Sequence, residues 1–266
     1  MSKKIVFFDI DGTIFDVDYG IMESTKKAIQ KLNENGHIPI ICTGRSRAMV
    51  PDMIVQLGFQ GILAGCGTYI EYKGEVLLDY ELDKGYIYKI IELAKQNQTI
   101  AIPEGTEFMY LNEEELPEVY QKLLALFFEQ FKNGIAPIEE NNVHAGKITL
   151  RTVKESNVEP ILEFVSDTLR PIYHEVLSFG GQAIELVPIQ FGKATAIDFL
   201  TKRLQITKEN TFAYGDSNND LDMLQAVEYG VAMGNSMESL LKVAKYHTER
   251  LEEDGIYKSL ERFHLI

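Results

Sequence analysis

The stretch of sequence that decides the expected fold is Ile5-Val6-Phe7-Phe8-Asp9-Ile10-Asp11-Gly12-Thr13. Four consecutive apolar residues that end in an Asp-Gly turn are typical of a strand buried on both faces of a parallel sheet. Ligands of open α/β sheets bind beyond the carboxyl ends of the strands, which is where Asp9 and Asp11 are placed. Two carboxylates at this spacing can share one metal ion or one reacting group, although a plain turn rich in Asp and Gly is the simpler interpretation.

The chain on both sides of this stretch alternates between strand and helix patterns. Apolar runs at residues 38–42, 62–64 and 211–214 predict further strands. Helical spacing of apolar residues predicts a helix over Met49–Leu57 and another that opens at Gly192-Lys193. The alternation indicates an α/β protein with a doubly wound, Rossmann-like parallel sheet.

The alternation is interrupted in the middle of the chain. Residues 69–78 predict a hairpin around Gly74, and residues 83–188 then read as a separate α+β unit with a net charge of −8. We therefore expect a core of residues 1–82 and 189–266, interrupted by an inserted domain of residues 83–188.

Composition and charge exclude several classes of protein. The 266 residues carry 40 acidic and 26 basic side chains, a net charge of −14, which argues against a nucleic-acid partner and against an anionic membrane surface. The chain contains no apolar run of the roughly 18 residues that a spanning helix needs, and the four apolar residues before Asp9 are too few for a signal peptide. Cys42 and Cys66 are read as buried thiols, so we expect a cytoplasmic protein.

Two further polar clusters have the character of anion sites. Thr43-Gly44-Arg45 directly follows an apolar run, and a hydroxyl and a glycine amide at the start of a helix can hold an anion, unless Thr43 is only a helix cap. Lys193 lies in the first turn of its predicted helix, where a cation is unfavourable. Its placement suggests a bound anion, although an exposed lysine is the simpler interpretation.

The last cluster, Gly215-Asp216-Ser217-Asn218-Asn219-Asp220, follows the strand pattern at residues 211–214. Its spacing resembles the start of an EF-hand loop, but Leu221 replaces the required glycine and Val227 the required glutamate. An acidic loop suited to Mg²⁺ remains. Together the four clusters describe a phosphate site with a hard metal ion.

The order of these motifs, Asp-x-Asp-Gly-Thr, Thr-Gly-Arg, Lys and Gly-Asp-x-x-Asn-Asp, resembles that of the haloacid dehalogenase (HAD) superfamily of aspartyl phosphatases. The long insertion before Lys193 resembles the Cof-type branch, which carries a C2 cap. The resemblance spans essentially the whole chain. One departure is Gly65-Cys66-Gly67-Thr68, where many relatives have Asn-Gly-Ala.

The resemblance implies a mechanism. Asp9 is then the nucleophile that becomes an aspartyl phosphate, and Asp11 protonates the leaving alcohol and later takes a proton from water. Mg²⁺ is implied on Asp9, on the backbone carbonyl of Asp11 and on Asp216, with Asp220 on the ion or next to it. The residues implied to hold the phosphoryl oxygens are Thr43, Gly44, Lys193, Asn219 and the amide of Ile10.

The resemblance implies Mg²⁺-dependent hydrolysis of small phosphate monoesters. Sugar phosphates are the first expected substrates, followed by phosphorylated cofactors such as flavin mononucleotide or pyridoxal phosphate. Three alternatives stay open. A phosphomutase would use the same aspartyl phosphate. A catalytically idle sensor of a phosphorylated ligand would not need the Asp9/Asp11 pair, and a glycosyltransferase would leave Lys193 without a role. The oligomeric state is not readable from the sequence.

Overall fold

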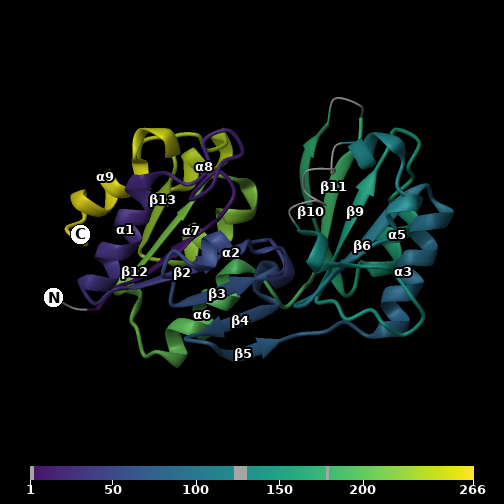
Figure 1. The fold of residues 1–266 in the computed structure, drawn as a ribbon, viewed down its shortest axis with the longest axis horizontal. Helices are drawn as coiled ribbons and strands as arrows, with labels where there is room; N and C mark the ends of the chain where they lie inside the picture. The colour runs from purple at the N-terminus through teal and green to yellow at the C-terminus, as the bar shows by residue number, and fades with distance from the viewer. Residues whose placement is uncertain (1–2, 123–130, 178–179) are drawn as a thin grey trace. The chain divides into compact units, whose positions relative to one another are not determined.

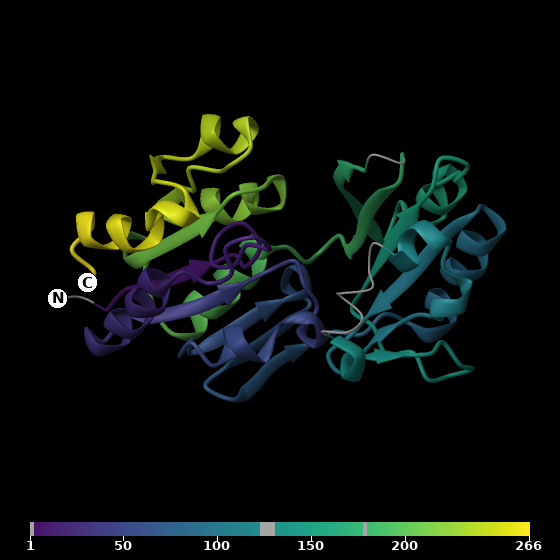
Figure 2. The same ribbon diagram turned by 45° about the horizontal axis from the view of Figure 1, so that its top comes forward.

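The computed structural model describes residues 3–122, 131–177 and 180–266 (Figures 1 and 2). The chain divides into two units. Unit 1 comprises Met1–Gly44, Asp52–Leu78 and Gly192–Ile266, and unit 2 comprises Arg45–Pro51 and Asp79–Phe191. Compared with the expected insertion at 83–188, unit 2 extends a few residues further at each end and also includes Arg45–Pro51.

Unit 1 is built on one sheet with the strand order β14-β13-β12-β1-β2-β3-β4-β5 among the described residues. Strands β14, β13, β12, β1, β2 and β3 pair in parallel, whereas β4 is antiparallel to β3. The strands are β1 (Ile5–Phe8), β2 (Ile38–Cys42), β3 (Gly61–Ala64), β4 (Tyr69–Tyr72), β5 (Glu75–Asp79), β12 (Thr211–Gly215), β13 (Tyr229–Ala232) and β14 (Tyr246–His247).

The side chains of β1 alternate between the two faces of the sheet, and all four of its residues are fully buried. Both faces of the sheet are therefore covered. Helix α1 packs against α9 near the two termini, and α6 packs against α7 (Figures 1 and 2). The helices of unit 1 are α1 (Glu23–Glu34), α2 (Asp52–Val55), α6 (Lys193–Arg203), α7 (Leu221–Ala226), α8 (Glu238–Val243) and α9 (Gly255–Arg262). The predicted α/β fold with a Rossmann-like parallel sheet is confirmed.

The predicted helix over Met49–Leu57 is wrong in its extent. Residues Arg47–Met49 form a single 3₁₀ turn, and α2 has only four residues. Pro51 lies between them; proline has no N–H to donate, and it disfavours helical backbone at the preceding Val50, whose ψ is 114°. The predicted hairpin is present: β4 and β5 are joined by Lys73 and Gly74, which both have positive φ.

Unit 2 is built on a second sheet with the strand order β10-β11-β9-β6-β7-β8 among the described residues. One face of its central strands packs against α3 and α5 in an apolar core. The elements are α3 (Lys84–Gln96), β6 (Thr99–Glu104), β7 (Met109–Tyr110), β8 (Ile135–Ala136), β9 (Lys147–Thr152), α5 (Glu159–Val165), β10 (Leu169–Val176) and β11 (Gln182–Pro188). Over the described parts of both units, no helix combines the length and apolar character needed to cross a membrane.

Candidate active site

The loop after β1 carries the first two acidic candidates. The N–H of Asp9 donates to the carbonyl of Tyr214 (3.0 Å), which continues the pairing of β1 with β12 by one residue. Gly12 then turns the chain with φ of +73°, and a Cβ atom there would lie 2.3 Å from a carboxylate oxygen of Asp216. Glycine is therefore needed at position 12 so that this turn and the loop after β12 can approach. Asp9 is buried, whereas Asp11 is exposed.

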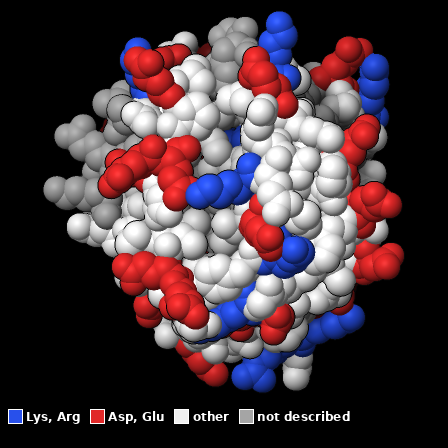
Figure 3. Space-filling model, turned by 90° about the vertical axis from the view of Figure 1, so that its right-hand side faces the viewer, with Lys and Arg blue, Asp and Glu red and all other residues white. Residues whose placement is uncertain are grey.

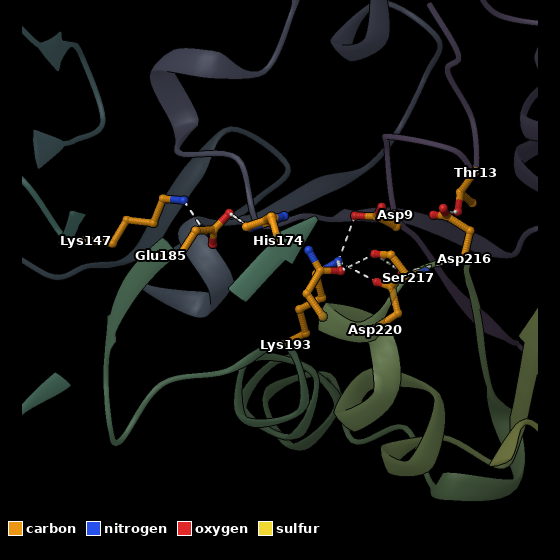
Figure 4. A network of polar contacts seen from close by, with 10 residues as sticks. Asp9, Thr13, Lys147, His174, Glu185, Lys193, Asp216, Ser217 and Asp220 are labelled. Carbon is orange, nitrogen blue, oxygen red and sulfur yellow. Dashed lines mark hydrogen bonds and ion pairs between the residues drawn. The ribbon is translucent and has the colours of Figure 1, made fainter. Parts of the chain in front are cut away.

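Lys193 comes from the first residue of α6 and is only 1% exposed. Its Nζ donates to Oδ1 of Asp9 at 2.7 Å and to Oδ1 of Asp220 at 2.5 Å (Figure 4). Oδ1 of Asn219 lies 3.5 Å from the same nitrogen. The charge that the sequence places unfavourably at a helix start is thus buried between carboxylates, so the exposed-lysine interpretation is wrong.

Asp220 is held by backbone hydrogen bonds within the loop after β12. Its Oδ2 accepts from the backbone N–H groups of Asp216 (3.0 Å) and Ser217 (3.1 Å), and Asp220 is fully buried. Gly215 leaves room for this arrangement, because a Cβ there would lie 2.5 Å from Cγ of Asp220. The carboxylate of Asp216 accepts a hydrogen bond from the hydroxyl of Thr13 at 3.3 Å (Figure 4).

The Thr43-Gly44 motif lies beyond the carboxyl end of β2. Strands β1 and β2 pair in parallel as far as Phe8 and Ile41, so Thr43 follows β2 at the same end of the sheet at which Ile10 follows β1. The Thr43 N–H donates to the carbonyl of Leu63 (2.8 Å), and the residue is 1% exposed. The topology therefore brings Ile10, Thr43 and Gly44 to the sheet edge from which Asp9 and Asp216 also project.

Burial and like charges perturb the acids at this edge. Burial, with the neighbouring charge of Asp220, raises the pKa of Asp9 well above its usual range, and Lys193 only partly offsets this. The same two causes raise the pKa of Asp216 to about 7. Burial alone would lower the pKa of Lys193, but Asp220 and Asp9 outweigh it and raise that pKa. The site therefore has more negative charge than its one buried lysine balances.

This acidic group fits a hard divalent cation. One carboxylate oxygen from each of Asp9, Asp216 and Asp220 lies within 4.8 Å of the others. Oxygen ligands with surplus negative charge are what Mg²⁺ prefers. Because both oxygens of Asp220 already accept hydrogen bonds, Asp9 and Asp216 are the better-placed ligands. The Asp11 carboxylate is not part of this group, which is compatible with the expected role of its backbone carbonyl.

Unit 2 contains a second cluster of buried charges that the sequence did not suggest. Lys147 on β9 is 2% exposed, and its Nζ lies 3.4 Å from Glu104 on β6 and 3.2 Å from Glu185 on β11. Glu185 also pairs with His174 at 3.0 Å (Figure 4). The available signal was the alternation of β9, which places Lys147, Thr149 and Arg151 on one face of the strand. That pattern is typical of a solvated face, so the sequence does not indicate that Lys147 is buried.

Comparisons with known proteins agree with this geometry. A family model described as haloacid dehalogenase-like hydrolase matches residues 6–260. The 5-amino-6-(5-phospho-D-ribitylamino)uracil phosphatase YitU of Bacillus subtilis (strain 168) is 26% identical over 267 residues, which cover 97% of each chain. A solved structure of a hypothetical protein from Geobacillus kaustophilus HTA426 is 28% identical, with a TM-score of 0.86 and complete coverage (100%) of both chains. A sugar phosphatase of HAD subclass IIB shares the fold with a TM-score of 0.83 at 23% identity, covering 99% of this chain and 100% of that one.

The chain belongs to the haloacid dehalogenase-like hydrolase family. Within that superfamily it is an enzyme of the phosphatase class, a phosphoric monoester hydrolase. The superfamily and the enzyme class expected from the sequence are thereby confirmed. The roles of individual residues and the identity of the metal stay predictions.

Proposed function

We propose that this enzyme hydrolyses small phosphate monoesters with Mg²⁺, through an aspartyl phosphate formed on Asp9. The observation that carries the proposal is the Asp9 carboxylate at the carboxyl end of β1, which is held by Lys193 beside Asp216 and Asp220. The hydrogen bond from Lys193 orients one oxygen of Asp9. A buried, oriented carboxylate with a balancing cation is suited to nucleophilic attack on phosphorus.

In the first step a carboxylate oxygen of Asp9 forms a bond to phosphorus, and the bond from phosphorus to the ester oxygen breaks. Asp11 gives its proton to the departing alkoxide. In the second step Asp11 takes a proton from water, whose oxygen attacks phosphorus and releases inorganic phosphate and the Asp9 carboxylate. The groups proposed to hold the phosphoryl oxygens during both steps are Lys193, Asn219, the hydroxyl of Thr43 and the amides of Ile10 and Gly44.

A bound Mg²⁺ would lie on Asp9, Asp216 and the backbone carbonyl of Asp11, where it supplies positive charge to the phosphoryl oxygens. Asp220 then acts through Lys193: it holds the ammonium group in place and supports the backbone of Asp216 and Ser217. The raised pKa values of Asp9 and Asp216 support a cation at this position, because a dication would remove the repulsion among these acids.

For the substrate we propose a small phosphorylated metabolite, with sugar phosphates first. YitU is named for a phosphorylated ribityl compound, and the subclass IIB neighbour is named a sugar phosphatase. Phosphorylated cofactors such as flavin mononucleotide are the next class to test. The thiols of Cys42 and Cys66 are buried and form no disulfide, which supports a reducing, cytoplasmic location.

We further propose that the insertion acts as a cap that selects small substrates. In the chain it lies between Thr43 and Lys193, both assigned to phosphate, and residues 83–188 have a net charge of −8. On the side of unit 2 shown in Figure 3, acidic side chains are spread over the visible surface, and basic ones lie among them without a continuous patch. This charge repels nucleic acids and acidic phosphopeptides. The rate constant kcat/KM should therefore fall steeply from small sugar phosphates to a phosphopeptide, and equal values would contradict a cap.

The direct test of the function is phosphate release from p-nitrophenyl phosphate and from a panel of sugar phosphates in the presence of Mg²⁺. We expect free inorganic phosphate and the dephosphorylated alcohol in equal amounts. Conversion of a sugar 1-phosphate to the 6-phosphate without free phosphate would instead establish the phosphomutase. Ligand binding without turnover of any substrate would establish the sensor.

A further inference from the structure

A buried acceptor beside the acidic site has no hydrogen-bond partner. Among the described residues, four buried side-chain polar atoms lack a partner: Ser24 Oγ, Ser46 Oγ, Arg151 Nε and Asn235 Oδ1. Of these, the Asn235 atom belongs to a side chain that contacts the Asp9–Thr13 turn. A buried acceptor left unpaired costs about 1–3 kcal/mol, so this atom is expected to have a partner in the working enzyme.

Asn235 lies in the loop between β13 and α8, and it joins the two acidic loops. Its Nδ2 donates to the carbonyl of Gly12 at 2.8 Å. Gly12 is the residue whose added Cβ would meet the carboxylate of Asp216. Two residues further along, the N–H of Met237 donates to the carbonyl of Asp216 at 3.0 Å. The side chain of Asn235 is therefore held at the border of the proposed cation site.

The orientation of the amide follows from its one hydrogen bond. A carbonyl can accept only from Nδ2, so a flipped amide would place two oxygens face to face. The neighbouring Gly234 ties this loop to the segment at Glu249 and Arg250, because its N–H donates to the carbonyl of Glu249 at 3.2 Å. A Cβ at Gly234 would lie 2.6 Å from the backbone nitrogen of Arg250.

We propose that Asn235 is a positioning residue of the cation site: its Nδ2 fixes the turn that carries Asp9 and Asp11, and its Oδ1 accepts a hydrogen bond from a water bound to the cation. This inference rests on the proposed Mg²⁺-dependent function. Mg²⁺ usually keeps several of its waters when it binds a protein, and each such water needs acceptors. Groups that hold a metal's ligands in this way typically change its affinity by about 10–100-fold when they are removed.

The test measures Mg²⁺ binding to the full chain by isothermal titration calorimetry, without substrate, so that the readout is independent of turnover. Asn235→Ala should weaken Mg²⁺ binding by at least about tenfold. Asn235→Asp keeps an acceptor for the water but places an oxygen against the carbonyl of Gly12, so it should lose Mg²⁺ affinity, although less than Asn235→Ala. Asn235→Leu has a similar shape without polar atoms and replaces the alanine variant if that one does not fold.

The matched control is Ser236→Ala. The hydroxyl of Ser236 donates to the carbonyl of Gly215 at 3.3 Å, so its loss also removes a side-chain hydrogen bond that holds this loop. We expect Mg²⁺ affinity unchanged in this variant.

Three results would overturn the inference while leaving the proposed function intact: unchanged affinity in Asn235→Ala, an equal loss in Ser236→Ala, or an equal loss in Asn235→Asp. A parent protein that binds no Mg²⁺ would overturn the proposed function and this inference together.

Discussion

Among the described residues, each unit buries a lysine between two carboxylates, but the acids of the two clusters are perturbed in opposite directions. In unit 1, Lys193 faces Asp9 and Asp220, and the carboxylate of Asp216 lies beside them. In unit 2, Lys147 faces Glu104 and Glu185, and His174 adds a further partner for Glu185.

The pKa values of Glu185 in unit 2 and Asp9 in unit 1 are shifted in opposite directions. Burial by itself would raise the pKa of Glu185, but Lys147 and His174 together lower it below its usual value of 4.5. In unit 1, burial and Asp220 raise the pKa of Asp9 in spite of Lys193. In unit 2 the opposite charges outweigh burial and lower the pKa of the acid, whereas in unit 1 burial and like charges outweigh the lysine and raise it, which leaves capacity for a cation at the strand end. Perturbed acids of the second kind are typical of functional sites.

The largest effect is expected for Asp9→Asn. An amide is a far poorer nucleophile than a carboxylate, so turnover should fall by at least about 10⁴-fold while the fold is retained. Phosphate release with Mg²⁺ is the measurement, and circular dichroism checks the fold. Asp198→Asn, which breaks an exposed ion pair with Lys202 on α6, is the matched control. Substantial turnover by folded Asp9→Asn would remove Asp9 from the mechanism.

Removal of the metal should have the next largest effect. Chelation with EDTA should lower turnover by at least about 10³-fold, and added Mg²⁺ should restore it, because the excess charge of Asp9 and Asp216 then has no counterion. Ca²⁺ should substitute poorly, since it prefers longer bonds and more ligands than Mg²⁺. Full activity after exhaustive chelation, or equal rates with Ca²⁺, would contradict the metal assignment.

Replacing Lys193 or Lys147 by methionine tests whether the first cluster serves turnover and the second serves stability. Lys193→Met should lower turnover by about 10²–10³-fold, because the proposed donor to the phosphoryl oxygens is lost. Lys147→Met leaves Glu104 and Glu185 buried without their cation and should cost about 3–5 kcal/mol of unfolding free energy. Turnover and urea denaturation of both variants are the measurements. If Lys147→Met loses more turnover than Lys193→Met, the two clusters have been assigned the wrong roles.

The smallest effect concerns acid stability. Because the folded pKa of Glu185 lies below its unfolded value of 4.5, its contribution to stability is present above that value and is lost as pH falls through the folded pKa. Denaturation at about pH 7 and about pH 3 should show the advantage of the parent protein over Glu185→Gln shrinking on acidification, by about 1–3 kcal/mol. Exposed Glu163→Gln on α5 serves as control. An advantage that does not change with pH would mean that Glu185 is not ion-paired in solution.

The site in unit 1 could be predicted because its signals are local. A strand buried on both faces appears in the sequence as an unbroken apolar run. The end of Ile5–Phe8 therefore identifies Asp9 as a candidate site residue without any knowledge of the residues that contact it. Lys193 stands out in the sequence because a helix start disfavours a cation. The resemblance of the motif order then connected these positions across the long insertion.

The remaining features depend on tertiary contacts. The polar face of β9 looks solvated in the sequence, and its burial depends on Glu104 and Glu185, which are distant in the chain. Asn235 reads as an ordinary turn residue after Gly234, and its bond to Gly12 spans more than two hundred residues. Nothing in the composition of Arg45–Pro51 indicates that this segment belongs to unit 2.

The proposed mechanism depends above all on the transfer of the phosphoryl group to Asp9. Rapid mixing with p-nitrophenyl phosphate and Mg²⁺, acid quenching and borohydride reduction would convert an aspartyl phosphate into homoserine, which peptide mass spectrometry locates. We expect homoserine at position 9, with aspartate retained at positions 11, 216 and 220. Homoserine at another position, or an enzyme that turns over with no reducible acyl phosphate, would contradict the mechanism.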